Sequence, residues 1–361
     1  MVSTARKVLA GLGAVTIAGL LAACAGGTPP AASGSGDDAA PETLTFVGYG
    51  GAGQDAMIAA WQDPFTDEHP NITFVNTSPP DLSQVQAQVQ AGAIQWDVVA
   101  VAAFAAQQNC GTLFEKLDFS DVDETDLVPG AVGECFMTGF YNATPFAYRT
   151  DAFPDPATAP KTIADFFDVE TYPGQRGVLT NLQNGILEYG LLGDGVSPDS
   201  LYPLDVPRSL AKWDTIRDAT TFAPNVGALQ QAVASNQVDL FLLSDSRLVP
   251  TMDEGMDITI VWDETVVTQS AFAVPLGSSH KETAQSFLAT LPGPQQVKVI
   301  TEALGTAPVN LAAPLDLSEN AQKLAVFDPS VNTGGTIVQD LDWWATNYND
   351  VQAEVTTWLA G

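Results

Sequence analysis

Strand-like and helix-like segments alternate along the chain after residue 43. Leu44–Val47 is a short apolar run, residues 55–68 have the pattern of a helix, and Ile72–Asn76 is again strand-like. A helical segment at 81–92 then leads to Trp96–Val101, whose apolar residues do not alternate with polar ones. Such a run is typical of a strand buried on both faces of a parallel sheet. The order therefore predicts an α/β fold with a parallel sheet.

The length of the chain bounds the number of folded units. The sequence has 361 residues, and roughly 320 of them follow residue 42, which is enough for two lobes. Strand-like and helix-like segments continue as far as a last helical stretch at 343–359.

The N-terminus has the pattern of an export signal. Arg6 and Lys7 precede an apolar stretch at 8–23, which suits a signal peptide and is short for a membrane span. It ends in Leu21-Ala22-Ala23-Cys24, which resembles the lipobox of bacterial lipoproteins. That resemblance implies cleavage before Cys24 and lipid on that residue. The alternatives are an ordinary signal peptide with a chance cysteine, or a short membrane anchor.

Residues 25–42 contain almost no large apolar side chains and are typical of a flexible tether. We therefore predict a signal peptide at 1–23, and a lipidated Cys24 with its tether at 24–42. The folded part would lie outside the cytoplasmic membrane, anchored to it by the N-terminal lipid.

The charge and the cysteines restrict partners and compartment. A formal net charge of −30 would repel nucleic acids and anionic membranes, so the acidic residues are interpreted as solvated surface, although they could attract cations.

If Cys24 carries lipid, Cys110 and Cys135 remain as a pair in an oxidising compartment, which favours a disulfide. It would stabilise the fold by ~3.5 kcal/mol in the chain-entropy model. The alternative is two buried free thiols.

The turn Gly48–Gly53 matches the G-x-G-x-x-G pattern of dinucleotide-binding loops. That fingerprint needs an acidic residue after the second strand, where this chain has Asn76, Thr77 and Ser78. Dinucleotides are also scarce outside the membrane, so we predict no cofactor. The glycines are interpreted as a tight strand-to-helix turn, or as a loop that brings backbone N–H groups and Tyr49 to a ligand in a cleft.

Short segments spread along the chain carry a resemblance to one family. In chain order they are Phe46–Ala56, Pro64-Phe65, Trp96–Val99, Cys110-Gly111, Leu117-Asp118, Cys135, Ala147–Asp151, Phe153-Pro154, Phe166–Asp168, Tyr172–Gly177, Leu187-Glu188, Asp194–Val196, Val261–Asp263, Ala273–Ser278, and Trp343-Trp344 with Asn347. Together they resemble the extracytoplasmic solute-binding proteins of ABC transporters, and most closely the spermidine/putrescine-binding type.

The resemblance implies a two-lobed periplasmic-binding-protein fold, in which each lobe is a mixed or parallel sheet flanked by helices. Lobe 1 would consist of 43–148 and 270–318, and lobe 2 of 149–269 and 319–361, with the ligand cleft between them. Hinge closure would bury a small solute, and the protein, as a monomer, would deliver it to the permease subunits in the membrane. This function includes no chemistry, so no enzymatic activity is expected.

In polyamine-binding members, aromatic side chains enclose the methylene chain and carboxylates hold the ammonium groups. Carried to this sequence, the aromatic residue of the first loop falls on Tyr49, beside Gly50-Gly51, and the position after the third strand falls on Phe104. The resemblance also places Tyr141 and Asn142 at the cleft. For Tyr49 the alternative is a surface turn, and for Phe104 it is the core.

The second lobe departs from the polyamine pattern. The loop Thr180–Asn184 lacks the expected carboxylates, although Glu188 follows one helical turn later. Ser270 stands where an aspartate is expected. The tryptophan common in relatives is lost at Ser244–Arg247, where Asp245 and Arg247 remain.

A zwitterion such as a short amino acid is therefore an alternative to a polyamine. Arg247 would bind its carboxylate with two parallel hydrogen bonds, and Asp245 or Glu188 would take the amine. An ion pair of Arg247 with Asp245 or Asp253 is the structural alternative.

Sequence motifs for catalysis give little support to an enzyme. His69 and His280 are far apart, and the chain has no H-E-x-x-H, G-x-S-x-G or C-x-x-C, so we predict no metal site. The alternatives to a binding protein are a secreted hydrolase that uses a pair of carboxylates and a non-catalytic structural surface lipoprotein.

Overall fold

The structure, a computed structural model, describes residues 40–361, which form one compact unit. The predicted signal peptide at 1–23, the predicted lipidation site at Cys24 and most of the predicted tether lie outside the described residues. Within the described part, no helix is both long and apolar enough to cross a membrane.

The strands of this unit form one ten-stranded mixed sheet. They are β1 (Glu42–Val47), β2 (Ile72–Thr77), β3 (Val98–Ala102), β4 (Val132–Gly133), β5 (Phe136–Arg149), β6 (Arg176–Leu179), β7 (Thr220–Ala223), β8 (Leu240–Leu242), β9 (Ile258–Ala273) and β10 (Gly335–Val338). The order is β2-β1-β3-β9-β5-β8-β6-β7, with β10 paired to β9 and β4 to β5. As predicted, β1 is parallel to β2 and β3, whereas β9 is antiparallel to β3. The predicted α/β class is confirmed.

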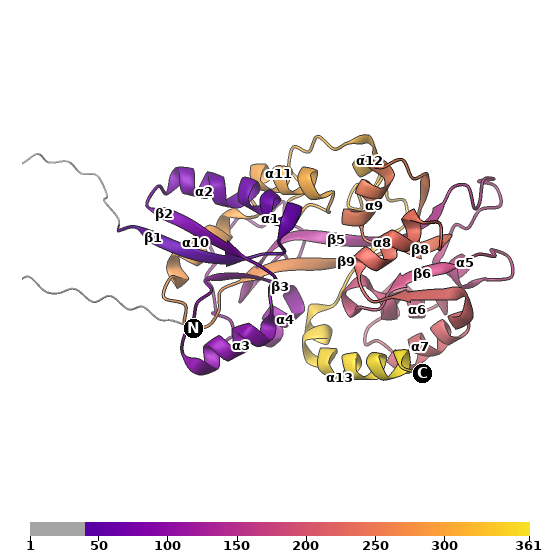
Figure 1. Ribbon diagram of the computed structural model, residues 1–361, viewed down its shortest axis with the longest axis horizontal. Helices are drawn as coiled ribbons and strands as arrows, with labels where there is room; N and C mark the ends of the chain where they lie inside the picture. The colour runs from indigo at the N-terminus through magenta and orange to yellow at the C-terminus, as the bar shows by residue number, and fades with distance from the viewer. Residues whose placement is uncertain (1–39) are drawn as a thin grey trace, which may run out of the picture. The chain divides into compact units, whose positions relative to one another are not determined.

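Helices cover the sheet in two groups (Figure 1). They are α1 (Gly51–Met57), α2 (Asp63–Glu68), α3 (Leu82–Ala91), α4 (Ala103–Gln108), α5 (Ile163–Phe167), α6 (Ile186–Gly193), α7 (Val206–Asp214), α8 (Val226–Ala234), α9 (Asp245–Asp253), α10 (Lys281–Thr290), α11 (Pro294–Leu304), α12 (Glu319–Gln322) and α13 (Leu341–Leu359). Those around β1, β2 and β3 belong to lobe 1, and those around β6, β7 and β8 to lobe 2 (Figure 1).

The two long strands β5 and β9 connect the lobes. They pair with each other in antiparallel fashion along most of their length, while β9 pairs with β3 in lobe 1 and β5 pairs with β8 in lobe 2. The pairing shifts its register between Thr138 and Phe140, and again between Thr144 and Phe146. The lobe boundary expected between residues 148 and 149 falls at the end of β5, and the one expected between 269 and 270 falls inside β9.

The first helix begins earlier than the sequence pattern indicates. The predicted start at residue 55 is wrong, because α1 begins at Gly51 and a π-helical turn at Ile58–Gln62 links it to α2. Gly50 precedes the helix with a φ of 74°, a conformation that glycine adopts without the steric cost of a side chain. A Cβ atom on Gly50 would also lie 2.8 Å from the Ser78 Oγ. The glycines therefore shape a tight turn, as one of the two interpretations expects.

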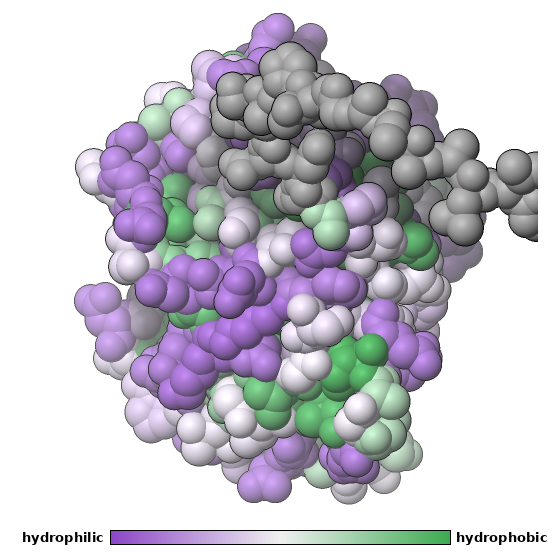
Figure 2. All heavy atoms as spheres, turned by 90° about the vertical axis from the view of Figure 1, so that its left-hand side faces the viewer, coloured by the Kyte–Doolittle hydropathy of each residue, from purple (hydrophilic) through white to green (hydrophobic). Residues whose placement is uncertain are grey.

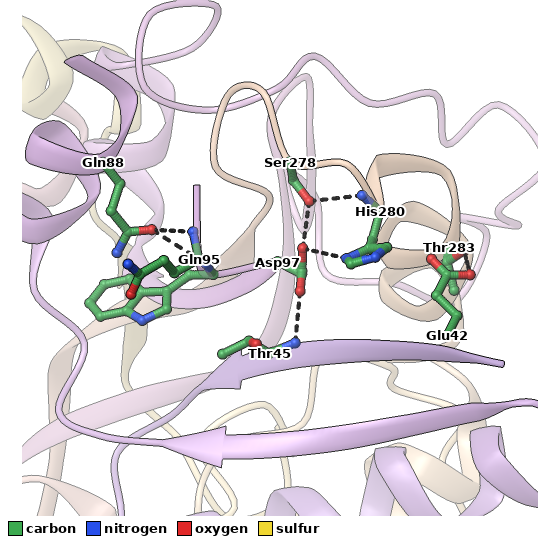
Figure 3. Close-up of polar contacts among 9 residues, drawn as sticks. Glu42, Thr45, Gln88, Gln95, Asp97, Ser278, His280 and Thr283 are labelled. Carbon is green, nitrogen blue, oxygen red and sulfur yellow. Dashed lines mark hydrogen bonds and ion pairs between the residues drawn. The ribbon is translucent and has the colours of Figure 1, made fainter. Parts of the chain in front are cut away.

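A polar clamp holds the start of β3 to the turn before α10 (Figure 3). The Asp97 carboxylate accepts hydrogen bonds from the Thr45 backbone N–H at 2.8 Å and from the Ser278 hydroxyl at 2.7 Å. The His280 Nδ1 lies 3.0 Å from the same carboxylate. The Ser278 hydroxyl in turn accepts a hydrogen bond from the His280 backbone N–H at 3.1 Å. Asp97, which belongs to the Trp96–Val99 segment of the family resemblance, therefore has a structural role in this fold.

Lobe 1 also contains a disulfide and an aromatic core. Cys110 and Cys135 form the disulfide, with Cα atoms 5.5 Å apart. In the core, Phe272 lies between Phe46 and Trp61, with ring centroids 5.6 and 4.9 Å away. The surface at this end of the molecule is largely hydrophilic, with smaller hydrophobic areas (Figure 2).

Candidate ligand-binding site

A cavity of about 480 Å³ lies between the lobes, at the carboxyl ends of parallel strands from both. Among its lining residues, Ala52 and Gly53 follow β1, and Ala103 and Phe104 follow β3; Asn181, Gln183 and Asn184 follow β6, and Ser244, Ser246 and Arg247 follow β8. Phe140 on β5, and Thr268 to Ser270 on β9, line it where these strands pass between the lobes. In open α/β sheets, ligands bind at this edge because loops and helix N-termini converge there. The size is ordinary for a small-molecule site.

A larger cavity of about 650 Å³ is a poorer candidate. It is lined by residues between Thr301 and Val331, so that a single stretch of chain encloses it. Its lining has no residue from the loops that follow β1, β3, β6 or β8, where ligands bind in open α/β sheets. We therefore take the interlobe cavity as the candidate site.

Several residues expected from the sequence meet in this cavity. Tyr49, Phe104 and Asn142 line it together with Arg247 and Ser270, although they come from both lobes and from both crossing strands. Desolvation raises the pKa of the Tyr49 hydroxyl, and its contact with the Ser270 side chain opposes this shift. The Tyr49 residue as a whole remains 45% exposed. Gly50 and Gly51 do not line the cavity; they form the turn that presents Tyr49 and Ala52.

Tyr141 lies on the other face of β5. Its ring packs edge-on against Phe327 at 5.5 Å, and its hydroxyl accepts a hydrogen bond from the Gln269 side chain at 3.1 Å. Successive side chains of a strand point to opposite faces, so Tyr141 and Asn142 cannot both face the cleft. The aromatic side chain of β5 in the cavity is that of Phe140, which the sequence analysis missed.

Glu188 is fully buried and does not line the cavity. Its Oε1 accepts hydrogen bonds from the Tyr202 hydroxyl at 2.6 Å, the Gln339 amide at 2.9 Å and the Trp344 indole at 3.0 Å. Burial raises the pKa of this carboxyl, and the three donors oppose the shift. Glu188 thus stands behind Gln339, which does line the cavity.

Asp245 is also buried beneath the cavity wall. Its carboxylate accepts hydrogen bonds from the backbone N–H groups of Ala143 at 2.9 Å and Ser246 at 2.7 Å. It therefore ties the start of α9 to β5 at the point where that strand leaves lobe 1. Burial raises the pKa of Asp245 to about 7, against the lowering effect of these backbone donors.

This shift predicts a pH-dependent stability. The unfolded chain ionises Asp245 near pH 4 and the folded chain only near pH 7, so folding is penalised increasingly as the pH rises between these values. The stability that Asp245 contributes is full below about pH 4 and is lost as the pH passes 7. We expect the unfolding free energy of the wild type, relative to Asp245→Asn, to fall by about 4 kcal/mol over this range.

Urea unfolding of both proteins at each pH unit from 4 to 8 measures this difference. Subtracting the variant removes the titration of the other acidic residues, because both proteins share them. Parallel curves for the two proteins would contradict a raised pKa at Asp245.

Arg247 lines the cavity and has no ion-pair partner among the described residues. The predicted alternative, an ion pair with Asp245 or Asp253, is absent from this part of the chain, because Asp245 binds backbone N–H groups and Asp253 accepts from Asn320 at 2.7 Å. The other arginines described are all engaged: Arg149 with Asp239, Arg176 with backbone carbonyls, Arg208 with Asp194, and Arg217 with Asp214. The cavity thus holds a guanidinium that is free to bind an anion.

The lining includes no aspartate or glutamate. It combines Arg247 with the aromatic rings of Tyr49, Phe104 and Phe140 and with amide and hydroxyl side chains. An adjoining cavity of about 330 Å³ contains Asp81, but that carboxylate caps α3 by accepting from the Ser83 N–H at 2.7 Å. The site therefore suits a small molecule with one carboxylate and leaves the two ammonium groups of a polyamine without acidic partners.

The fold and this cleft define the class of protein, a two-lobed protein that binds a small solute between its lobes. Comparison with known families identifies this class: residues 60–327 match the family of bacterial extracellular solute-binding proteins. The chain belongs to this family and is the solute-binding subunit of an ABC importer.

Individual relatives share most of the chain. The γ-aminobutyric acid-binding protein of Pseudomonas aeruginosa is 28% identical over 326 residues, which cover 88% of this chain and 91% of that protein. The solved structure of the Atu4243 GABA receptor is 30% identical, has a TM-score of 0.79, and covers 88% of this chain and 97% of its own. An ABC transporter substrate-binding protein from Bradyrhizobium japonicum is 25% identical with a TM-score of 0.79, covering 88% and 99% of the two chains.

Proposed function

We propose that this protein captures a small zwitterionic amino acid of the γ-aminobutyrate type. The observation that carries the proposal is Arg247, an arginine with no ion-pair partner among the described residues, in a cavity whose lining has no acidic residue. A guanidinium binds a carboxylate with two parallel hydrogen bonds. The aromatic rings of Tyr49, Phe104 and Phe140 suit the short aliphatic chain and the amine.

Two relatives support this ligand class. The names of the Pseudomonas aeruginosa protein and of the Atu4243 receptor both specify γ-aminobutyrate. A polyamine is less well supported, because its second ammonium group would face Arg247 and find no carboxylate in the lining.

Hinge closure would bury the ligand. The lobes meet through β5 and β9, whose paired segments change register near the cavity, and we assign 43–148 with 270–318 to one moving body and 149–269 with 319–361 to the other. In this scheme the closed monomer passes the solute to the permease without chemical change. The lipobox-like sequence before Cys24 supports a lipid anchor on the cell membrane.

A thermal-shift panel tests the ligand class. The protein would begin at residue 25, and the ligands would be γ-aminobutyrate, β-alanine, 5-aminopentanoate, butyrate, butylamine, putrescine and spermidine. A ligand at 100 times its dissociation constant adds about 2.7 kcal/mol to the unfolding free energy, so we expect a clear shift with an amino acid. A shift with the polyamines and none with the amino acids would overturn the proposal.

A further inference from the structure

Gln339 connects β10 to α13 and lines the interlobe cavity, although the residue is 6% exposed. Its amide nitrogen donates hydrogen bonds to the Leu182 carbonyl oxygen and to the Glu188 Oε1, each at 2.9 Å. Both acceptors belong to lobe 2, in the loop after β6 and in α6. The side chain is therefore held by two partners on the side away from the ligand space.

These contacts fix which end of the amide faces the cavity. A backbone carbonyl oxygen only accepts hydrogen bonds, so the nitrogen of Gln339 must point toward Leu182. With Glu188 as the second acceptor, both amide hydrogens have partners. The Gln339 carbonyl oxygen accepts no hydrogen bond from the described residues, and it is the atom that remains for a ligand.

Two other amides of the lining have the same arrangement. The Asn142 nitrogen donates to the Ser270 hydroxyl at 2.8 Å, and the Asn184 nitrogen donates to the Thr144 hydroxyl at 2.9 Å. Each leaves its carbonyl oxygen without a donor among residues 40–361. A hydroxyl partner can also donate, so these two orientations are reversible, whereas that of Gln339 is not.

We propose that the Gln339 carbonyl oxygen is the acceptor for the ammonium group of the ligand, and that Glu188 is its positioning residue. This inference rests on the proposed function and specifies the amine end of the same site. A primary ammonium group has three N–H donors, and with no carboxylate in the lining the amide oxygens are its acceptors. Glu188 acts one layer behind, because its oxygen holds the Gln339 nitrogen.

The proposal makes Gln339 a determinant of specificity for primary amines. A trimethylammonium group carries the same charge and still interacts with aromatic faces, but it has no N–H to donate. Gln339 should therefore distinguish γ-aminobutyrate from its N,N,N-trimethyl analogue, whereas the aromatic rings should not.

Isothermal titration of the protein from residue 25 onward tests this, with these two ligands as probes. Gln339→Met keeps the length of the side chain and removes the oxygen. We expect its dissociation constant for γ-aminobutyrate to rise about 10- to 100-fold, with the constant for the trimethyl analogue changing about 3-fold or less. Gln175→Met is the matched control, since Gln175 is half-buried and lies outside the cavity, and it should change neither constant.

Glu188 is tested through the same discrimination. Glu188→Gln keeps an oxygen acceptor and should retain the preference for the primary amine, whereas Glu188→Leu should lose it. Equal weakening of both ligands by Gln339→Met, or no weakening of either, would overturn the inference while leaving the proposed function intact. If the wild type binds neither probe nor any amino acid of the panel, both proposals fall. Should Glu188→Leu not fold, the Gln339→Met titrations decide.

Discussion

Replacing Arg247 with alanine is expected to weaken binding of γ-aminobutyrate by about 30- to 1000-fold, or about 2–4 kcal/mol. Arg247 is exposed in the cavity and carries no ion pair with another described residue. When the lobes close, the ligand carboxylate loses water, and without the guanidinium it would be left without a cationic partner. The loss should therefore greatly exceed that of an ordinary surface charge.

Two further variants make this experiment specific. Arg247→Lys keeps the charge but lacks the planar guanidinium that makes two parallel hydrogen bonds. Its dissociation constant should therefore lie between those of the wild type and the alanine variant. Arg208→Ala removes an exposed arginine that pairs with Asp194 outside the cavity, and binding should not change. Titration calorimetry on the four proteins gives the constants. A change of less than about 3-fold for Arg247→Ala would remove Arg247 from the site.

Replacing Arg176 with leucine is expected to lower the unfolding free energy by about 3–5 kcal/mol. Arg176 is fully buried in lobe 2, at the start of β6. Its guanidinium donates to four backbone carbonyls, those of Phe166 at 3.0 Å, Asp168 at 3.2 Å, Tyr172 at 2.6 Å and Gly174 at 2.6 Å. Leucine fills part of the space but leaves these carbonyls without donors.

The Arg176 effect should appear in stability and not in binding. Because Arg176 does not line the cavity, the folded fraction of Arg176→Leu should keep its affinity for the ligand. Guanidinium unfolding curves measure the loss, and Arg208→Leu, whose ion pair is exposed, should cost no more than about 1 kcal/mol. A loss of similar size in both variants would mean that water satisfies the four carbonyls of the Arg176 site.

Whether the sequence could predict that a residue lies at the cavity depended on how close the residue is to a recognisable strand. Tyr49 and Phe104 directly follow strands whose apolar pattern is visible in the sequence, so their position at the edge of the sheet could be inferred. For Tyr141 and Asn142 the sequence predicted an extended segment but not which side chain faces the cleft. The reason is that β5 shifts its register against β9 between Thr138 and Phe140. One residue of shift decides which face a side chain occupies.

The burial of the Glu188 and Asp245 carboxylates could not be predicted from the sequence either. The sequence places both near the site, but burial of each depends on partners that are distant along the chain. Glu188 is held by Gln339 and Trp344, more than 150 residues away, and Asp245 by Ala143, 102 residues away. No local pattern shows that such a carboxylate stands behind the cavity wall.

The sequence by itself determined the parallel order of the first strands, the glycine turn and the family, because each follows from local periodicity or from short segments in a fixed order. Only the tertiary structure decided which polar groups are available to a ligand. Arg247 is available because the nearby acidic residues Asp245 and Asp253 bind other groups, and the Gln339 oxygen is available because its nitrogen is held by Leu182 and Glu188. Hydrogen-bond satisfaction is a property of the packed molecule, so residue types and spacing alone do not reveal it.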